Sequence, residues 1–334
     1  MAKEYAPAPK FRTSIGGQAL IEGILMRGPG KQAIVVRSPE GLVEKVEELT
    51  LVRDKYPILG LPVIRGAVTF VDSMVKGVKA LMFSADYFPD ENLGEPSKFD
   101  RWLEKKFGSE KMQKFITALA VVLSLGLTIL LFFLLPTFLA GLIDPFIKSV
   151  TVHNLVESVI KLVIFFLYLL LCSKQKDIYR VFQYHGAEHK TIHCYEAGLP
   201  LTVENVQKFS RLHPRCGTNF LLIVMLVSIF VFAFLGWPSL AERIASRILL
   251  LPVVAGISYE IIRLAGRSEN PIIQTAIKPG LWLQYLTTRP PEDDMVAVAI
   301  ESLKAVLPEE EIIEGTVDYR HAEGPLPKPI EMVP

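Results

Sequence analysis

The sequence predicts an α-helical integral membrane protein with about four transmembrane helices and a small α+β cytosolic N-terminal domain. Half of its 334 residues are hydrophobic and its mean hydropathy is positive, which is high for a soluble protein of this length. A bilayer core about 30 Å thick requires roughly 20 mostly apolar residues in one helix. Apolar runs of about this length recur between residues 115 and 266.

The expected spans differ in the charges that interrupt them. The run 115–143 contains no charged residue, so it lacks the polar stripe that a buried helix of a large soluble protein normally has. The second span contains Glu157 and Lys161, which lie four residues apart and can pair on one helical face. The fourth contains Glu260, whose expected partner is Arg263, one turn away. The spans are predicted near residues 115–143, 152–172, 220–237 and 248–266.

The positions of lysine and arginine predict the orientation, because the cytosolic flanks of spans are enriched in both. The flank before the first span and the flank after the second are basic, whereas the two loops expected outside contain only Lys148, Arg243 and Arg247. Four spans return both termini to the cytosol, so we expect a multi-pass protein of the plasma membrane. The N-terminus shows no signal-peptide core or cleavage site. The cytosolic basic residues are Lys105, Lys106, Lys111, Lys114, Lys174, Lys176 and Arg180.

Three segments are expected along the chain. Residues 1–114 form the cytosolic N-terminal domain. Residues 115–266 form the membrane domain, with a cytosolic loop at 173–218 that is rich in histidine and cysteine. Residues 267–334 form a cytosolic C-terminal segment with one helix, 293–306, and a disordered tail.

The N-terminal domain begins with a Gly-rich stretch, 16–30, whose glycines allow tight or positive-φ backbone. A β-hairpin is expected from the β-rich runs 32–38 and 41–49, because Pro39-Glu40-Gly41 between them has the composition of a turn. An amphipathic helix follows at 62–85, which packs either on protein or on the membrane surface.

The loop 173–218 contains His185-Gly186-Ala187-Glu188-His189, which matches the H-x-x-E-H pattern of metal-dependent hydrolases. On an α-helix, residues 185 and 189 lie roughly 40° apart and one turn along, so both imidazoles can reach one ion. In this arrangement the histidines bind a divalent metal, commonly zinc, and Glu188 is the general base that takes a proton from the metal-bound water. The alternative is a wet or interfacial helix face on which these histidines only form hydrogen bonds.

Additional metal ligands are expected from the same loop. His193 continues the helical face but lies about 12 Å along the axis from His185, so it could share an ion only with His189. His213 and Cys216 are the leading candidates, although Cys216 also suits a buried apolar position. Cys194, Glu196 and Glu260 are further options.

Other functions are excluded or disfavoured. Gly28-Pro29-Gly30-Lys31 lacks the Ser or Thr and the helix that follow in a phosphate-binding loop. A net charge of +1 without a dense basic cluster excludes nucleic acid as a partner. Glu22, with Arg27 and Arg65 on either side of the hairpin, could line a site, but a structural ion pair is its expected role. The three cysteines fit a reducing compartment better than a disulfide framework.

Five stretches carry a resemblance to a known family: GGQALIEGILMRGP, RGAVTFVDSMVKGVKAL, YHGAEHKTIHCYE, RLHPRCGTNF and PGLWLQYLTTRPPEDD. In these stretches the chain resembles the YqhQ-like family of bacterial membrane proteins, a domain of unknown function predicted to be a metal-dependent enzyme. The resemblance covers residues 14 to about 306. The resemblance implies a membrane protein with metal-dependent activity, and it does not indicate a substrate.

These observations lead to a membrane-embedded, metal-dependent hydrolase at the cytosolic face, with His185 and His189 as ligands, Glu188 as general base and zinc as the expected ion. The lipid bilayer is the expected partner, a lipid or a membrane protein is a suitable substrate, and a homo-oligomer is compatible with the sequence. The alternative is a non-enzymatic protein, either a conduit for an ion or small solute or a membrane-protein assembly factor. It is motivated by Glu157, Lys161 and Glu260 within the spans.

Overall fold

A computed structural model describes the chain over residues 9–50, 56–87, 109–143, 146–147, 149–233, 235, 240–267, 270, 275 and 278–320. The predicted basic residues Lys105 and Lys106 and the tail 321–334 lie outside these residues. The chain forms two compact units. The first combines residues 1–88, 169–227 and 250–334, and the second combines residues 89–168 and 228–249.

The first unit contains a four-stranded antiparallel sheet in the order β1-β2-β3-β4. Its strands are β1 (Gly16–Leu20), β2 (Gly23–Arg27), β3 (Lys31–Ser38) and β4 (Gly41–Glu48). The predicted hairpin is confirmed as β3 and β4, in which Ser38 pairs with Gly41 and Gly41 adopts a φ of +135°. The Gly-rich stretch forms two further strands. The positive φ expected among its glycines is found instead at Glu22, where φ is +50°.

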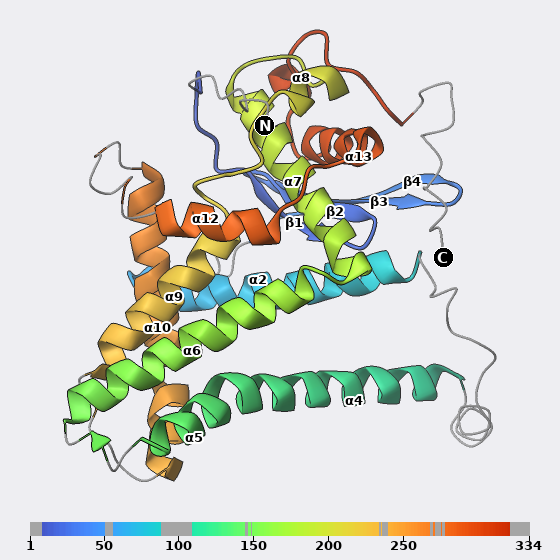
Figure 1. Cartoon of the computed structure of the whole chain (residues 1–334). Helices are drawn as coiled ribbons and strands as arrows, with labels where there is room; N and C mark the ends of the chain where they lie inside the picture. Colours follow the sequence, from blue (N-terminus) through green and yellow to red (C-terminus); the bar gives the residue numbers. More distant parts are fainter. Residues whose placement is uncertain are drawn as a thin grey trace. The chain divides into compact units, whose positions relative to one another are not determined.

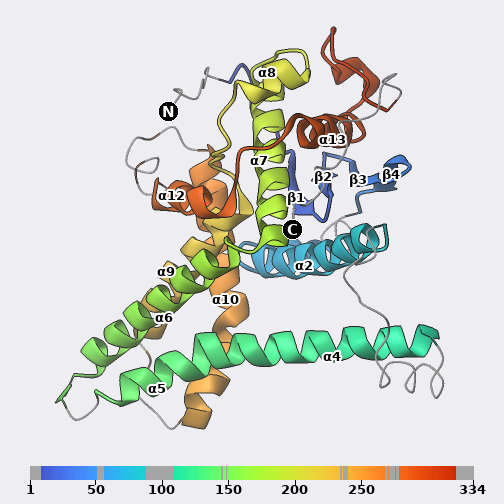
Figure 2. The same ribbon diagram turned by 45° about the vertical axis from the view of Figure 1, so that its right-hand side comes forward.

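Helices cover both faces of this sheet, as both views show (Figures 1 and 2). Helices α7 (Lys176–Glu196) and α13 (Asp293–Lys304) pack on one face, where Ala33 and Val35 contribute to the main hydrophobic core. Helix α2 (Ile64–Ala85) packs on the other, over Ile34 and Val36. Because successive side chains of a strand point to opposite faces, β3 is apolar on both and buries two cores.

Helix α2 confirms the predicted amphipathic helix, and α13 confirms the predicted C-terminal helix. Ala80 of α2 is buried against the sheet, so one face of α2 packs on protein. Large apolar side chains of α2 remain exposed, so a membrane contact for them stays a prediction. These exposed side chains are Ile64, Val71, Met74, Val75, Val78 and Met82.

A buried ion cluster joins the sheet to α7 and α13. The Glu22 carboxylate accepts hydrogen bonds from Arg37 Nη2 at 2.7 Å, from Arg180 Nη2 at 2.6 Å and from the Tyr184 hydroxyl at 3.1 Å. Arg37 also pairs with Asp294 of α13. The expected structural ion pair of Glu22 is therefore confirmed. Its partners are Arg37 of β3 and Arg180 of α7 rather than the flanking Arg27 or Arg65.

Among the residues that the structure describes, three helices are long and apolar enough to cross a membrane. The first, Leu119–Gly141, runs through α4 (Ser109–Ile129), a π-helical segment η2 (Leu130–Leu134) and α5 (Leu135–Gly141). The others are Thr151–Cys172 within α6 (Val150–Cys172) and Ala245–Ala265 within α10 (Leu240–Arg267). The predicted third span corresponds to α9 (Gly217–Ala233), which has 17 residues and is shorter than these candidates.

The second unit contains a buried ion pair that differs from the predicted one. Both Arg247 Nη atoms donate to the Glu157 carboxylate, at 2.5 and 2.8 Å, and the Thr137 hydroxyl donates to it at 2.9 Å. Lys161, the expected partner, lies near the rings of Phe133 and Phe232. Arg247 is therefore a buried residue of α10 rather than part of an outside loop. The planar guanidinium donates one parallel N–H to each carboxylate oxygen, the bidentate geometry that makes arginine the usual partner of a buried carboxylate.

In the first unit, Glu260 of α10 pairs with Arg65 of α2 rather than with Arg263. Arg65 donates from Nε at 2.7 Å and from Nη2 at 2.5 Å. The two helices approach closely here, since a Cβ on Gly66 would lie 2.6 Å from the Cβ of Tyr259. The remaining elements are η1 (Pro57–Gly60), α8 (Val203–Gln207), α12 (Lys278–Thr287) and η4 (Glu309–Glu311).

Candidate metal centre

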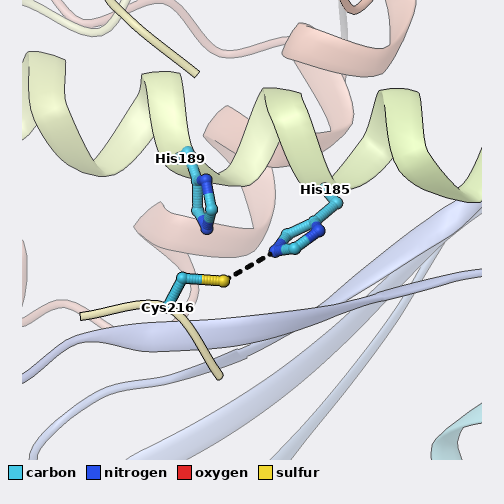
Figure 3. A group of neighbouring side chains, drawn as sticks. All are labelled: His185, His189 and Cys216. Carbon is cyan, nitrogen blue, oxygen red and sulfur yellow. Dashed lines mark hydrogen bonds between the residues drawn. The ribbon is translucent and has the colours of Figure 1, made fainter. Parts of the chain in front are cut away.

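Helix α7 carries the H-x-x-E-H motif and crosses the sheet beside β1. The prediction that the motif is helical is confirmed, and His185 and His189 project from the same side of the helix (Figure 3). Their ring centroids lie 4.4 Å apart. The two imidazoles therefore form a pair one turn apart, as a shared ion requires.

Cys216, which directly precedes α9, completes a group of three potential ligands. One ligand atom from each of His185, His189 and Cys216 lies within 4.8 Å of the others. His185 Nε2 is 3.1 Å from the Cys216 sulfur (Figure 3). His185 is partly exposed, whereas His189 and Cys216 are buried.

Backbone carbonyl groups fix the tautomer of both histidines. His185 Nδ1 lies 2.8 Å from the Thr287 carbonyl oxygen, and His189 Nδ1 lies 2.6 Å from that of Arg211. A carbonyl can only accept, so each Nδ1 carries the proton and each neutral ring keeps its Nε2 lone pair. This is the outer-shell arrangement of metal-binding histidines, in which the second ring nitrogen donates to a carbonyl or carboxylate.

Helix α12 holds the loop that carries Cys216. The buried Gln284 side chain accepts from His213 N at 2.8 Å and donates to the His213 carbonyl at 2.7 Å. Asn219 donates to the Pro214 carbonyl at 2.7 Å and accepts from Gln284 at 2.9 Å. Sequence reasoning missed α12, although Gln284 and Thr287 lie in the stretch PGLWLQYLTTRPPEDD that carries the family resemblance.

His193 and His213, also predicted as ligands, lie beside the three-residue group without belonging to it. Their ring centroids are 4.7 Å apart, and that of His213 lies 5.4 Å from His189. His193 Nε2 lies 2.9 Å from the Leu212 carbonyl oxygen. Burial lowers the pKa of both rings, which favours the neutral form and avoids positive charge beside the site.

The remaining candidates, Cys194 and Glu196, have other partners. Burial raises the pKa of the Cys194 thiol to about 12, and its sulfur lies 3.7 Å from the Pro200 carbonyl oxygen. Glu196 accepts from the Thr13 backbone at 2.8 Å and pairs with Arg215. All three cysteines of the chain carry free thiols.

Glu188 lies on the neighbouring face of α7 and is buried against β1. Its Oε1 accepts from Gly17 N at 2.7 Å, and its Oε2 is buried without a hydrogen-bond partner among the described residues. Burial raises the pKa of this carboxyl group. Only glycine allows this approach, because a Cβ at Gly17 would lie 3.2 Å from the Glu188 carboxyl carbon and 2.5 Å from the Leu25 carbonyl oxygen.

A close backbone contact explains why the second position of the motif, residue 186, is glycine. A Cβ there would overlap the backbone oxygen of Arg289, in the segment that continues from Thr287. We expect Gly186→Ala to displace this segment and to destabilise the protein by about 1–3 kcal/mol. Thermal unfolding of the purified chain would show a lower midpoint. Gly16→Ala is the matched control, since nothing lies within 4 Å of that Cβ, and an equal loss in both variants would contradict this explanation.

Comparison with known proteins identifies the family. The family model described as protein of unknown function DUF1385 matches residues 61–309. The uncharacterized protein YqhQ of Bacillus subtilis (strain 168) is 38% identical over 319 residues, which cover 93% of this chain and 98% of that protein. No solved structure matches the chain. The chain therefore belongs to the DUF1385 family of proteins of unknown function, and it is similar to YqhQ over nearly its whole length.

Proposed function

We propose that this protein is a membrane-embedded, metal-dependent hydrolase that acts at the cytosolic membrane face. The main support is the group of His185, His189 and Cys216, in which both histidine tautomers are set for metal binding by backbone carbonyls. Three protein ligands with one open position are typical of catalytic rather than structural zinc sites. Neutral imidazoles and a thiolate suit zinc better than calcium or magnesium, which prefer oxygen ligands.

The residues around the group fit this chemistry. Thr218 places its hydroxyl oxygen 2.9 Å and its backbone nitrogen 3.4 Å from the Cys216 sulfur, and donation from both would stabilise a thiolate. A bound zinc ion would supply Lewis acidity and lower the pKa of a water molecule toward neutrality. Glu188 would receive the proton of the attacking water at Oε2, the oxygen without a partner, while Gly17 N holds Oε1. Its raised pKa favours return of that proton to the leaving group.

The apolar helices support the membrane assignment. In the most apolar window of Leu119–Gly141, only 6% of the residues are buried in protein, so lipid is the solvent that this surface fits. Helix α6 ends at Cys172, and α7 with the histidines begins at Lys176. The site therefore follows a candidate span directly. We place both termini and α7 in the cytosol, as the flanking lysines predict.

The test uses the full-length protein reconstituted in lipid vesicles with fluorogenic peptide, phosphoester and lipid-ester substrates. We expect hydrolysis of one class, loss of that hydrolysis after treatment with a zinc chelator, and recovery after zinc is added back. Hydrolysis that survives complete removal of metal would contradict the metal-dependent reaction.

A cysteine nucleophile is a second candidate, favoured by the 3.1 Å contact between His185 Nε2 and the Cys216 sulfur. With Nδ1 bonded to the Thr287 carbonyl, His185 could act as the base that activates a thiol. This reaction would be insensitive to the chelator and abolished by Cys216→Ser and by thiol alkylation. The conduit and assembly-factor alternatives stay predictions, and the structure gives Glu157 and Glu260 arginine partners that explain both residues without transport.

A further inference from the structure

A cationic pocket lies at the start of α7, directly after the candidate span of α6. Its volume is about 480 Å³, within the range of sites for small molecules. Four of its six described lining residues are cationic, and none of the six is acidic. The lining residues are Ser173, Lys174, Lys176, Tyr179, Arg180 and Arg289.

The charges of this pocket are only partly neutralised by the protein. Arg180 pairs with Glu22, but Lys174, Lys176 and Arg289 form no ion pair with any residue that the structure describes. Arg289 lies over the ring of Tyr179 at 5.4 Å and donates from Nη1 to the Tyr285 carbonyl at 3.0 Å. Its Nε is buried and lacks a hydrogen-bond partner among the described residues. The nearby acidic residue Asp177 is exposed and lies in the first turn of α7.

Two features of the backbone hold these cations in place and add hydrogen-bond donors for an anion. The Arg289 backbone N–H donates to the Phe182 carbonyl at 2.8 Å, which fixes the arginine beside α7. The first turn of α7 adds free backbone N–H groups, because the side chain of the N-cap residue Gln175 forms no capping hydrogen bond with them. Backbone N–H groups at a helix start favour an anion. Excess positive charge in a cavity with a fixed guanidinium is the arrangement that proteins use for phosphate.

We propose that this pocket binds a phosphate group, and that the source is the headgroup of an anionic phospholipid. The pocket begins at Ser173, the residue after the last residue of the candidate span Thr151–Cys172, so it lies where headgroups meet the end of a span. Its volume exceeds what a phosphate ion alone would fill. Basic pockets on the cytosolic side of membrane helices bind phosphorylated headgroups in this way. The site is separate from the histidine group and does not depend on the proposed hydrolysis.

Native mass spectrometry of the full chain in neutral detergent tests this inference. Phosphatidylglycerol, phosphatidylcholine and glycerol 3-phosphate would be titrated separately. We expect phosphatidylglycerol to bind more tightly than phosphatidylcholine and to weaken with salt. The double variant Lys174→Gln/Lys176→Gln should bind it about thirtyfold less tightly, since each cation near a headgroup contributes about fivefold. Both lysines are exposed and form no ion pair with a described residue, so folding should be unaffected.

The control is Lys31→Gln/Lys208→Gln, which removes the same charge from two exposed lysines that do not line the pocket. Glycerol 3-phosphate binding that the pocket variant loses and the control keeps would support the phosphate site and identify a soluble source. Equal phosphatidylglycerol affinity in wild type and pocket variant, or an equal loss in both variants, would overturn the inference.

Discussion

Replacing His185 with alanine is expected to lower the zinc content of the purified full-length protein from about one ion per chain to background. His189→Ala should have the same effect, because each variant removes one of three ligand atoms that lie within 4.8 Å of one another. Inductively coupled plasma mass spectrometry on protein purified without a histidine tag measures this directly. The tag must be absent because it binds zinc itself.

The matched control is His193→Gln on the same helix. His193 directs Nε2 to the Leu212 carbonyl oxygen rather than to the three-residue group, and glutamine can still donate to a carbonyl. We expect this variant to keep its zinc. Equal zinc in wild type and His185→Ala would show that the ion, if any, binds elsewhere. Loss in His193→Gln equal to that in His185→Ala would extend the ligand set beyond the three residues.

Glu188→Gln should lower the hydrolytic rate constant by about 10²–10⁴-fold and leave the zinc content unchanged. Glutamine keeps an oxygen for the Gly17 N–H and nearly the same volume, so the packing against β1 is preserved. It cannot accept the proton of the attacking water at neutral pH. The measurement is the turnover of whichever substrate the vesicle assay identifies.

Glu196→Gln serves as the comparison for this variant. Glu196 is another buried glutamate of α7, and it is bonded to Thr13 and Arg215 rather than directed at β1. Its replacement should affect stability more than turnover measured at a temperature where both variants are folded. Full activity in Glu188→Gln would remove the residue from the mechanism and leave its buried carboxyl group as a structural feature.

Local patterns predicted the parts of this molecule that depend on sequence neighbours. The helical spacing of His185 and His189, the hairpin of β3 and β4, and the helices α2 and α13 follow from periodicity and turn residues that act over a few positions. Sequence reasoning missed strands β1 and β2. Strand β2 is buried on both faces, so its sequence is a short apolar run without the alternation that indicates a strand.

Contacts between distant segments were the ones that sequence reasoning missed. Spacing predicts that Glu157 pairs with Lys161, four residues away, whereas its partner in the structure, Arg247, is 90 residues away. The carbonyl of Thr287 that sets the tautomer of His185 is 102 residues away. Such partners leave no periodic signal in a single sequence. The sequence points to Cys216 only because it lies in the same polar loop as the motif, and the structure places its sulfur in the three-residue group.

The most direct test of the proposed metal centre is X-ray absorption spectroscopy at the zinc edge on the full-length protein. We expect nitrogen ligands at about 2.0 Å and one sulfur ligand at about 2.3 Å, with the sulfur signal lost in Cys216→Ser. A zinc ion surrounded only by oxygen, or a sulfur signal that persists in Cys216→Ser, would contradict a centre built from His185, His189 and Cys216.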